Sequence, residues 1–443
     1  MSKYPLLVLI GALILTVACG NGSGSSSGAS SSNNNTSGCA GTTPAGAASN
    51  VQAITVDGGP FGGYPEAAFA TVTICVPKSS ACQNIDHVLV DTGSYGLRVL
   101  ASGAAQGELS PTLLPKEFFG VNPIVECAPF LSFLTWGPVE MADVKLAPGE
   151  IAYDIPIQVI GDSNFPDTEL PAACLNFGGT PVDGLTGNNG LHANGILGIG
   201  VFPDDCGIGC TESGSNNPDL YYTCPSGNCQ VAVLASETQN VQNPVSSLSQ
   251  DNNGTIIELP AISSSGAATV NGSLVFGIGT QSNNGLNGAT ALGLSVCTTT
   301  SPSSCNDGDF TTIYKGTSYP DSFVDSGSNG IFFLTSSLTG IPGCTGDTDF
   351  YCPASTESLS ATNEGVNGNT KVTSFTVANA DRLNGNFFAF NDRAGPGIPP
   401  SDTSSSGSAN YFDWGMPFFF GCNVFTAIYG EDTPAGAGPY VAY

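Results

Sequence analysis

Two short acidic segments are the residues of this sequence that could do chemistry. "HVLVDTGSYGLRVL" spans residues 87–100, and "FVDSGSNGI" spans residues 323–331. In each, an Asp follows apolar residues, as at the end of a buried strand, and a hydroxyl residue, Gly and Ser come next. A buried carboxyl needs nearby hydrogen-bond donors, and a Gly allows the backbone to approach closely. The segments therefore predict two carboxyls fixed by hydrogen bonds, those of Asp91 and Asp325. The supporting residues are Thr92, Gly93, Ser94, Ser326, Gly327 and Ser328.

Two carboxyls brought within a few ångströms of each other cannot both ionise easily, so one keeps a proton at moderate pH. The charged member can accept a proton from a water held between them, while the protonated member donates to a substrate carbonyl. That is general acid-base hydrolysis of an amide. Because the titrations of the two groups are coupled, neither Asp is assigned a separate role.

The acidic turn belongs to a longer internal repeat. "NGILGIG" at 194–200 follows the first turn, and "FFFGCNVFTAIYG" at 418–430 follows the second. Each half thus pairs its Asp with a distant apolar-apolar-Gly step, "ILG" at 196–198 and "FFG" at 419–421. Short apolar runs between Gly, Pro, Asn and Ser clusters, such as "CQVAVLA" at 229–235, predict strands, and 58 Gly with 30 Pro interrupt helices. We expect a mainly β protein of two related lobes.

Together these motifs resemble pepsin-like, two-lobed aspartic peptidases, in which each lobe carries one Asp-Thr/Ser-Gly-Thr/Ser turn and one apolar-apolar-Gly strand. The likeness covers roughly residues 51–443, and "GSLVFGIG" at 272–279 resembles the strand that opens the second lobe of that family. The resemblance implies a pseudo-twofold fold, with Asp91 and Asp325 as the catalytic pair. It also implies that Thr92 and Ser326 grip across the lobes, and that Ser94 and Ser328 bond the outer carboxyl oxygens.

Some residues depart from the family pattern. The region expected to form the flap, residues 132–144, lacks the usual Tyr, so Trp136 is the candidate flap aromatic, with a buried packing Trp as the alternative. Arg98 stands where the family usually has an aromatic residue. No basic pro-segment precedes the body, so either the enzyme needs no latch or there is no proteolysis to restrain.

The N-terminus is typical of an exported lipoprotein. Residues 1–18 contain one Lys and an apolar run, which predicts a signal peptide. Cys19 follows Ala18 and resembles the Cys that is lipidated in bacterial lipoproteins, with a plain signal peptide as the alternative. Gly20 after the anchor favours the outer membrane, with the exposed face undetermined. The Ser, Gly and Asn of residues 19–50 predict a disordered tether, followed by lobes at 51–237 and 238–443. With this N-terminus and its Cys-rich body, the chain resembles bacterial lipoproteins of uncharacterised function that carry the pepsin pattern.

Charge and cysteines narrow the function further. A net charge of −27 repels phosphate backbones, so nucleic acid is not an expected partner, and the membrane is reached only through the lipid. Fifteen Cys less Cys19 leave an even number, which predicts disulfides in an exported chain. Short loops bounded by Cys pairs at 75 and 82, 297 and 305, and 344 and 352 suit local bridges. Zinc at Cys206, Cys210, Cys224 and Cys229 is the rival hypothesis, but we expect neither a metal nor another cofactor.

Other nucleophile schemes have little support, because only His87 and His192 could serve them and no "GxSxG" elbow is present. The favoured hypothesis is an aspartic endopeptidase-like lipoprotein that acts on an extended peptide or protein segment. The alternatives are a cleft that binds a protein or glycan without turnover, and a structural protein of the envelope. The sequence does not indicate the oligomeric state.

Overall fold

The computed structural model describes residues 39, 44–101, 109–110, 113–130, 132–182, 190–296, 307–397 and 411–443. The expected signal peptide and Cys19 lie outside these residues. Among the described residues, no helix combines the length and the apolar character required to cross a bilayer.

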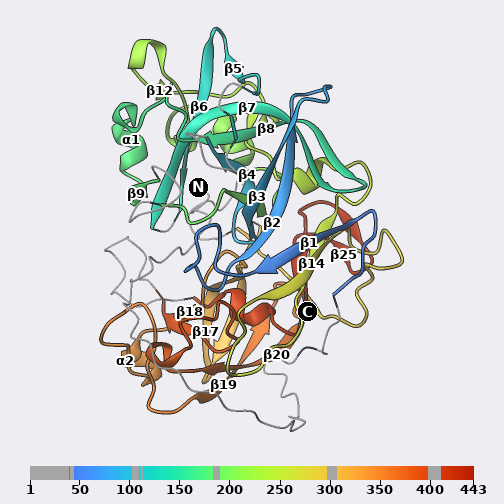
Figure 1. Cartoon of the computed structure of the whole chain (residues 1–443), viewed down its shortest axis with the longest axis vertical. Coiled ribbons are helices and arrows are strands. Elements are labelled where there is room, and N and C mark those ends of the chain that lie inside the picture. Colours follow the sequence, from blue (N-terminus) through green and yellow to red (C-terminus); the bar gives the residue numbers. More distant parts are fainter. Residues whose placement is uncertain are drawn as a thin grey trace, which may run out of the picture.

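The N-terminal half is built of strands of two to 15 residues and of brief helical turns, shown in blue to green in Figure 1. Its strands are β1 (Val51–Val56), β2 (Ala68–Cys75), β3 (Cys82–Asp91), β4 (Tyr95–Leu100), β5 (Phe118–Phe119), β6 (Asn122–Pro129), β7 (Phe133–Ala147), β8 (Glu150–Ile160), β9 (Thr180–Pro181), β10 (Gly195–Ile199), β11 (Tyr221–Thr223) and β12 (Gln230–Val231). The helix α1 covers Ala172–Leu175, and 3-10 turns lie at Asp167–Glu169, Gly207–Thr211, Gly214–Asn216, Pro225–Gly227, Glu237–Gln239 and Pro244–Ser247.

The C-terminal half repeats this style, in yellow to red. Its strands are β13 (Gly254–Glu258), β14 (Val270–Phe276), β15 (Ala291–Gly293), β16 (Phe310–Tyr314), β17 (Thr317–Val324), β18 (Ile331–Phe333), β19 (Glu357–Glu364), β20 (Thr370–Val377), β21 (Ala394–Pro396), β22 (Asp413–Trp414), β23 (Asn423–Ala427), β24 (Asp432–Thr433), β25 (Gly436–Ala437) and β26 (Tyr440–Ala442). The helix α2 covers Ser336–Thr339, with 3-10 turns at Ala380–Arg382 and Met416–Phe419.

Strands from both halves meet in one sheet. Antiparallel β1 pairs with both β2 and β14, and β13 pairs with β14 and β23. In Figure 1, β1 and β14 lie side by side between the upper and the lower group of strands. A separate sheet in the lower group has the order β20-β19-β16-β17-β22-β18-β21. The predicted mainly β class is confirmed, with strands of both halves sharing one sheet and a second sheet in the lower group, whereas the lobe boundary at 237 and 238 stays a prediction.

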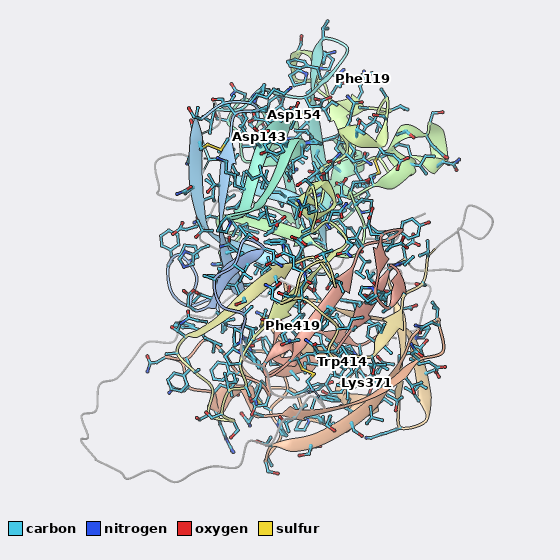
Figure 2. The ribbon with its side chains drawn as sticks, turned by 90° about the vertical axis from the view of Figure 1, so that its right-hand side faces the viewer. Phe119, Asp143, Asp154, Lys371, Trp414 and Phe419 are labelled. Atoms are coloured by element: carbon cyan, nitrogen blue, oxygen red, sulfur yellow. A yellow bond between two sulfur atoms is a disulfide. The ribbon has the colours of Figure 1, made fainter. Side chains whose placement is uncertain are left out.

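The lower lobe has an aromatic core. The rings of Phe333 and Phe412 are stacked at 5.1 Å between centroids, and Phe412 stacks on Trp414 at 5.6 Å. Phe375 meets Trp414 edge-on at 5.2 Å. Figure 2 shows Trp414 and Phe419 within this lobe. The ring burial holds β22 against the neighbouring strands, and β22 is the strand that lies beneath the second acidic turn.

One predicted strand is largely wrong. "CQVAVLA" at 229–235 keeps only Gln230–Val231 as a strand, paired with β11. Ala232 and Leu234 are buried with Val241 and Cys210 instead. Their apolar character therefore reflects packing beneath a loop rather than a longer ladder, an ambiguity of any short apolar run.

Twelve described Cys form six disulfides. The expected local bridges Cys75–Cys82 and Cys344–Cys352 are present, while the pair at 297 and 305 lies outside the described residues. The remaining bridges are Cys39–Cys422, Cys127–Cys174, Cys206–Cys210 and Cys224–Cys229. The four Cys considered as zinc ligands are thus joined in two pairs, which removes their thiolates from any metal site.

The end of the expected tether lies against the body. Cys39 is bonded to Cys422, and the Ala45 amide donates to Glu258 at 2.6 Å. Asn50 is fully buried and donates to the Phe276 carbonyl at 2.9 Å. The sequence assigns these residues to the tether because a segment of Ser, Gly and Ala cannot form a hydrophobic core of its own. In the structure, a disulfide and the existing sheet hold them against the core of the body.

Candidate active site

The first acidic turn is positioned by three neighbouring strands. β3 ends at Asp91, β10 runs parallel to it, and Gly198 lies opposite Asp91. On the other side, Gly198 lies opposite Gly96 of β4. A Cβ at position 198 would stand 2.7 Å from the Tyr95 carbonyl carbon, so only Gly permits this approach. The "ILG" step thus holds the strand that supports the turn, as expected.

The second turn has the same arrangement with a different strand from the one predicted. β22 runs parallel to β17 with Val324 opposite Trp414, which brings Gly415 beside Asp325. It is antiparallel to β18, with Ile331 opposite Trp414. A Cβ at 415 would lie 2.0 Å from the Gly330 carbonyl oxygen. The supporting step is therefore "DWG" at 413–415.

The prediction of "FFG" at 419–421 for this place is wrong. Phe419 ends the 3-10 turn at Met416–Phe419, and Phe420 only bridges Leu259. Both triplets end in Gly, but "FFG" matches the apolar pattern and "DWG" does not. Strand register, which no local pattern contains, decides between them.

Thr92 and Ser326 link the two turns reciprocally. The Thr92 amide donates to Ser326 Oγ at 3.1 Å, and the Ser326 amide donates to Thr92 Oγ1 at 2.9 Å. The two hydroxyls then donate across the lobes, Thr92 to the Val324 carbonyl at 3.2 Å and Ser326 to the Val90 carbonyl at 2.8 Å. This pattern is twofold, and it places the two turns against each other.

Each carboxyl has the same local donors. The Gly93 amide donates to Asp91 Oδ1 at 2.8 Å, and the Gly327 amide donates to Asp325 Oδ1 at 2.7 Å. Ser94 Oγ donates to Asp91 Oδ2, and Ser328 Oγ donates to Asp325 Oδ2 at 2.7 Å.

The two carboxyls also lie close to one another. A Cβ added to Gly93 would stand 2.6 Å from Asp325 Cγ, so the Asp325 carboxyl packs directly on the other turn. All eight residues that the sequence singled out in the two turns are therefore brought together, with both Asp side chains fully buried.

Burial raises the pKa of Asp91, and the hydrogen bond from Ser94 and the interaction with Asp325 limit that increase. Burial also raises the pKa of Asp325 well above its ordinary value, and the charges of Asp91 and Asp413 add to the increase. Like charges in a water-poor site have this effect. The pair is thus built to hold one proton at a pH where two separate carboxyls would hold none.

Sequence reasoning missed Asp413. This carboxyl lies in β22, is fully buried, and has no hydrogen-bond partner for either oxygen within the described part of the chain. Burial raises its pKa well above the ordinary range, with the Ser328 hydroxyl acting in the opposite direction and the charge of Asp91 adding to the increase. The only local signal was an acidic residue two places before a Gly.

Tyr64 is a second residue that sequence reasoning missed. It is buried, its ring stacks on that of His192 at 5.7 Å between centroids, and its hydroxyl has no partner among the described residues. Burial raises the pKa of this phenol, the charge of Arg393 opposes the rise, and Asp325 and Asp91 add to it.

The hairpin of β6 and β7 occupies the region expected to form a flap. Near its turn, the rings of Phe130 and Phe133 are stacked at 4.6 Å, and both side chains are buried. Trp136 lies further along β7, is 1% exposed, and packs against Tyr222. This placement fits the packing alternative for Trp136. The hairpin is also joined to α1 by the buried disulfide Cys127–Cys174.

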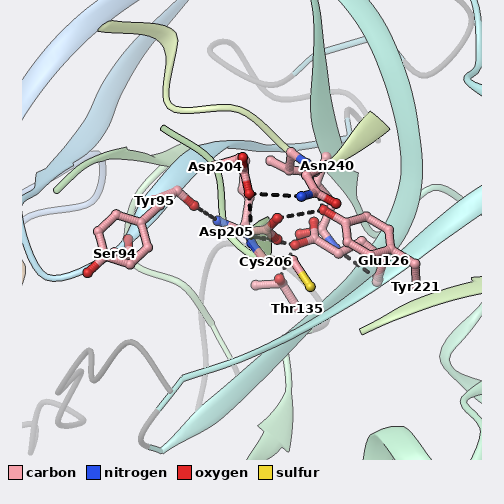
Figure 3. A network of polar contacts seen from close by, with 12 residues as sticks. Ser94, Tyr95, Glu126, Thr135, Asp204, Asp205, Cys206, Tyr221 and Asn240 are labelled. Atoms are coloured by element: carbon pink, nitrogen blue, oxygen red, sulfur yellow. Dashed lines mark hydrogen bonds and ion pairs between the residues drawn. The ribbon is translucent and has the colours of Figure 1, made fainter. Parts of the chain in front are cut away.

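Arg98 is the cation of a buried polar network after the first turn. Figure 3 labels Glu126, Asp205 and Tyr221 of this network. The Nη1 of Arg98 donates to the Tyr95 carbonyl at 2.6 Å, and its Nη2 pairs with Glu126 and, at 2.9 Å, with Asp205. Tyr221 donates to the other Asp205 oxygen at 2.7 Å. The guanidinium also lies 5.7 Å from the centre of the Phe130 ring. Arg98 therefore connects the strand after Asp91 to the β6 and β7 hairpin.

Two groups of described side chains bring three ligand atoms within reach of a single ion, Glu169 with Cys224 and Cys229, and Asp381 with Cys344 and Cys352. In both, the sulfurs belong to a disulfide. Each group therefore offers one carboxylate, which is fewer ligands than a protein metal site uses.

The chain belongs to a family of proteins of unknown function, DUF3443, whose profile matches residues 46–443. No curated protein matches it. Among solved structures, it is similar to the crystal structure of aspartic proteinase from Irpex lacteus, with 13% sequence identity and a TM-score of 0.47, over 85% of this chain and 93% of that one.

Proposed function

We propose that the protein is an aspartic endopeptidase-like hydrolase, in which Asp91 and Asp325 activate a water that attacks the peptide carbonyl. The observation that carries the proposal is the reciprocal pairing of Thr92 with Ser326, which sets the two carboxyls against each other. Water gives a proton to the charged carboxyl while the protonated one donates to the carbonyl oxygen, which forms a tetrahedral intermediate with two hydroxyls. When the C–N bond breaks, the carboxyl that took the proton of the water passes it to the leaving amine, and one hydroxyl of the intermediate returns its proton to the other carboxyl.

The proposed substrate is a peptide or protein segment in an extended conformation. We further propose that the body is held at the bacterial cell envelope, in the outer membrane, by a lipid on Cys19. A chain with 36 Asp and Glu against 9 Lys and Arg repels acidic partners, which favours neutral or basic segments as substrates.

The test is cleavage of a mixed peptide pool between pH 3 and 8 by the parent and by Asp91→Asn and Asp325→Asn. Asp381→Asn, which removes an exposed carboxylate, is the matched control. Cleavage by the parent and the control that both dyad variants lose supports the proposal. Equal cleavage by all four proteins would show a contaminating peptidase.

A second candidate function is binding without turnover, of a protein or a glycan. It is favoured by the full burial of both carboxyls and by the disulfide that bonds α1 to the β6 and β7 hairpin. Cys127→Ser/Cys174→Ser separates the candidates. If the double variant cleaves peptides and the parent does not, the hairpin is a latch on an enzyme. If neither cleaves and both bind the same partner, the binding function is supported.

A further inference from the structure

Asp413 takes the place of an apolar residue in the symmetry of the site. In the first lobe, Gly198 lies opposite Asp91, and Ile196 stands two residues before it. In the second lobe, Gly415 lies beside Asp325, and Asp413 stands two residues before it. The twofold relation between the turns therefore matches Asp413 with Ile196, which is fully buried and apolar.

The surroundings of Asp413 are mostly apolar. On one side β18 contributes Ile331 and Phe332, and on the other β17 contributes Phe323. The charge of Asp91 acts on both Asp413 and Asp325, and the charge of Asp413 acts on Asp325. Arg98 acts on Asp91 from the first lobe. A buried carboxyl with no hydrogen-bond partner is costly when charged. Asp413 is thus a proton-holding group next to the acidic pair.

Ser328 links the loop that carries Asp325 to the strand that carries Asp413. Its hydroxyl donates to Asp325 Oδ2 at 2.7 Å, and it is the polar neighbour of Asp413. Its carbonyl accepts the Met416 amide at 2.8 Å, while the Asp325 amide donates to the Trp414 carbonyl at 3.1 Å. The strand that carries Asp413 is therefore bonded to the loop that carries Asp325 on both sides.

We propose that Asp413 is a positioning residue for Asp325. From the strand that is bonded to the Ser328 loop, it keeps the proton of the acidic pair on Asp325. This inference rests on the proposed function for its catalytic meaning, but not for its geometry. Three carboxyls in one buried place release protons less readily than two, because each new charge would face another. Asp91 is then the member of the pair that ionises first, and Asp325 is the acid.

The experiment follows the carboxyl titration directly, so that it does not depend on turnover. The full chain is labelled with 13C at the Asp side-chain carboxyls, and its signals are followed by NMR against pH in the parent and in Asp413→Asn. Signals of the pair are assigned with Asp91→Asn and Asp325→Asn. We expect the upper apparent pKa of the pair to fall by about one unit in Asp413→Asn, because the buried cluster then has one carboxyl fewer whose ionisation would oppose that of Asp325. No change, or a rise, overturns the proposal.

Two further variants guard the interpretation. Asp413→Leu places an apolar side chain where the first lobe has Ile196, and it should lower the same pKa. A fold defect of the Asn variant alone therefore does not decide the outcome. Glu258→Gln removes another buried carboxyl, one that accepts hydrogen bonds from the Ala45 amide and the Asn423 side chain, and should leave the titration of the pair unchanged. A shift of the same size in this control would contradict the proposal.

Peptide cleavage provides the second readout. If the parent is active, the alkaline limb of its pH-rate profile should move to lower pH by the same amount in Asp413→Asn, because the acid loses its proton earlier. A titration that shifts in a protein that never cleaves peptides supports the role of Asp413 and rejects the proposed hydrolase. If the parent cleaves peptides and the titration of the pair is the same in Asp413→Asn, the proposed hydrolase is supported and the role of Asp413 is rejected.

Discussion

The amide of Thr92 donates to the hydroxyl of Ser326, and the amide of Ser326 donates to the hydroxyl of Thr92, at 3.1 and 2.9 Å. These residues lie 234 positions apart in the chain, and both are buried. Each hydroxyl also donates to a carbonyl of the opposite lobe, so the pair makes four hydrogen bonds across the boundary between the turns.

Thr92→Val should therefore destabilise the protein by about 1–3 kcal/mol, because it leaves a buried amide and a buried carbonyl without partners. Urea unfolding followed by Trp fluorescence measures the change. The control is Thr55→Val on β1, whose hydroxyl bonds only the exposed Asn271 side chain. Equal effects at the two positions would contradict a special role for the cross-lobe bonds.

Asp413→Asn should stabilise the fold at neutral pH by about 1–3 kcal/mol, because folding at that pH forces Asp413 either to take up a proton or to bury a charge, and Asn does neither. The pKa of Asp413 is raised in the folded protein, so its folded state holds the proton more tightly than the unfolded chain does. This tighter proton binding makes its full contribution to the stability of the folded state below about pH 4, the ordinary pKa of Asp. The contribution is lost as the pH rises.

The advantage of the Asn variant should consequently be absent at pH 3 and grow toward pH 7, provided that both proteins stay folded across the range. Thermal unfolding of both proteins over this interval measures it. A constant difference at all pH values would show that Asp413 does not titrate there.

Gly415→Ala should be strongly destabilising, by more than about 3 kcal/mol, because the new Cβ would lie 2.0 Å from the Gly330 carbonyl oxygen. Gly209→Ala is the control, since its nearest neighbour would be at 3.5 Å, an ordinary contact. Urea unfolding compares them. Tolerance of Ala at 415 would reject the assignment of "DWG" as the step beneath Asp325.

Arg98→Met should cost about 3–5 kcal/mol of stability, because it leaves Glu126 and Asp205 buried without their cation. Adding Glu126→Gln and Asp205→Asn should recover much of the loss, since no uncompensated charge then remains. The unfolding free energies of the single and triple variants measure this recovery. If the triple variant is no more stable than the single one, burial of charge is not the cause.

The sequence by itself determined what is local. Asp91 and Asp325 receive their donors from the second and third residues that follow them, so the four-residue motif contains the whole arrangement. The short bridges Cys75–Cys82 and Cys344–Cys352 close loops of a few residues, which spacing alone suggests.

Only the tertiary structure decided which residues meet over long distances. The strand beneath Asp325 begins at Asp413, a residue that matches no apolar pattern, and Cys39 joins Cys422 across a separation of 383. Register and chain closure depend on packing of the whole fold, and the side-chain types near one position do not encode them. A third buried carboxyl at the acidic pair therefore could not be foreseen from its neighbours in the chain.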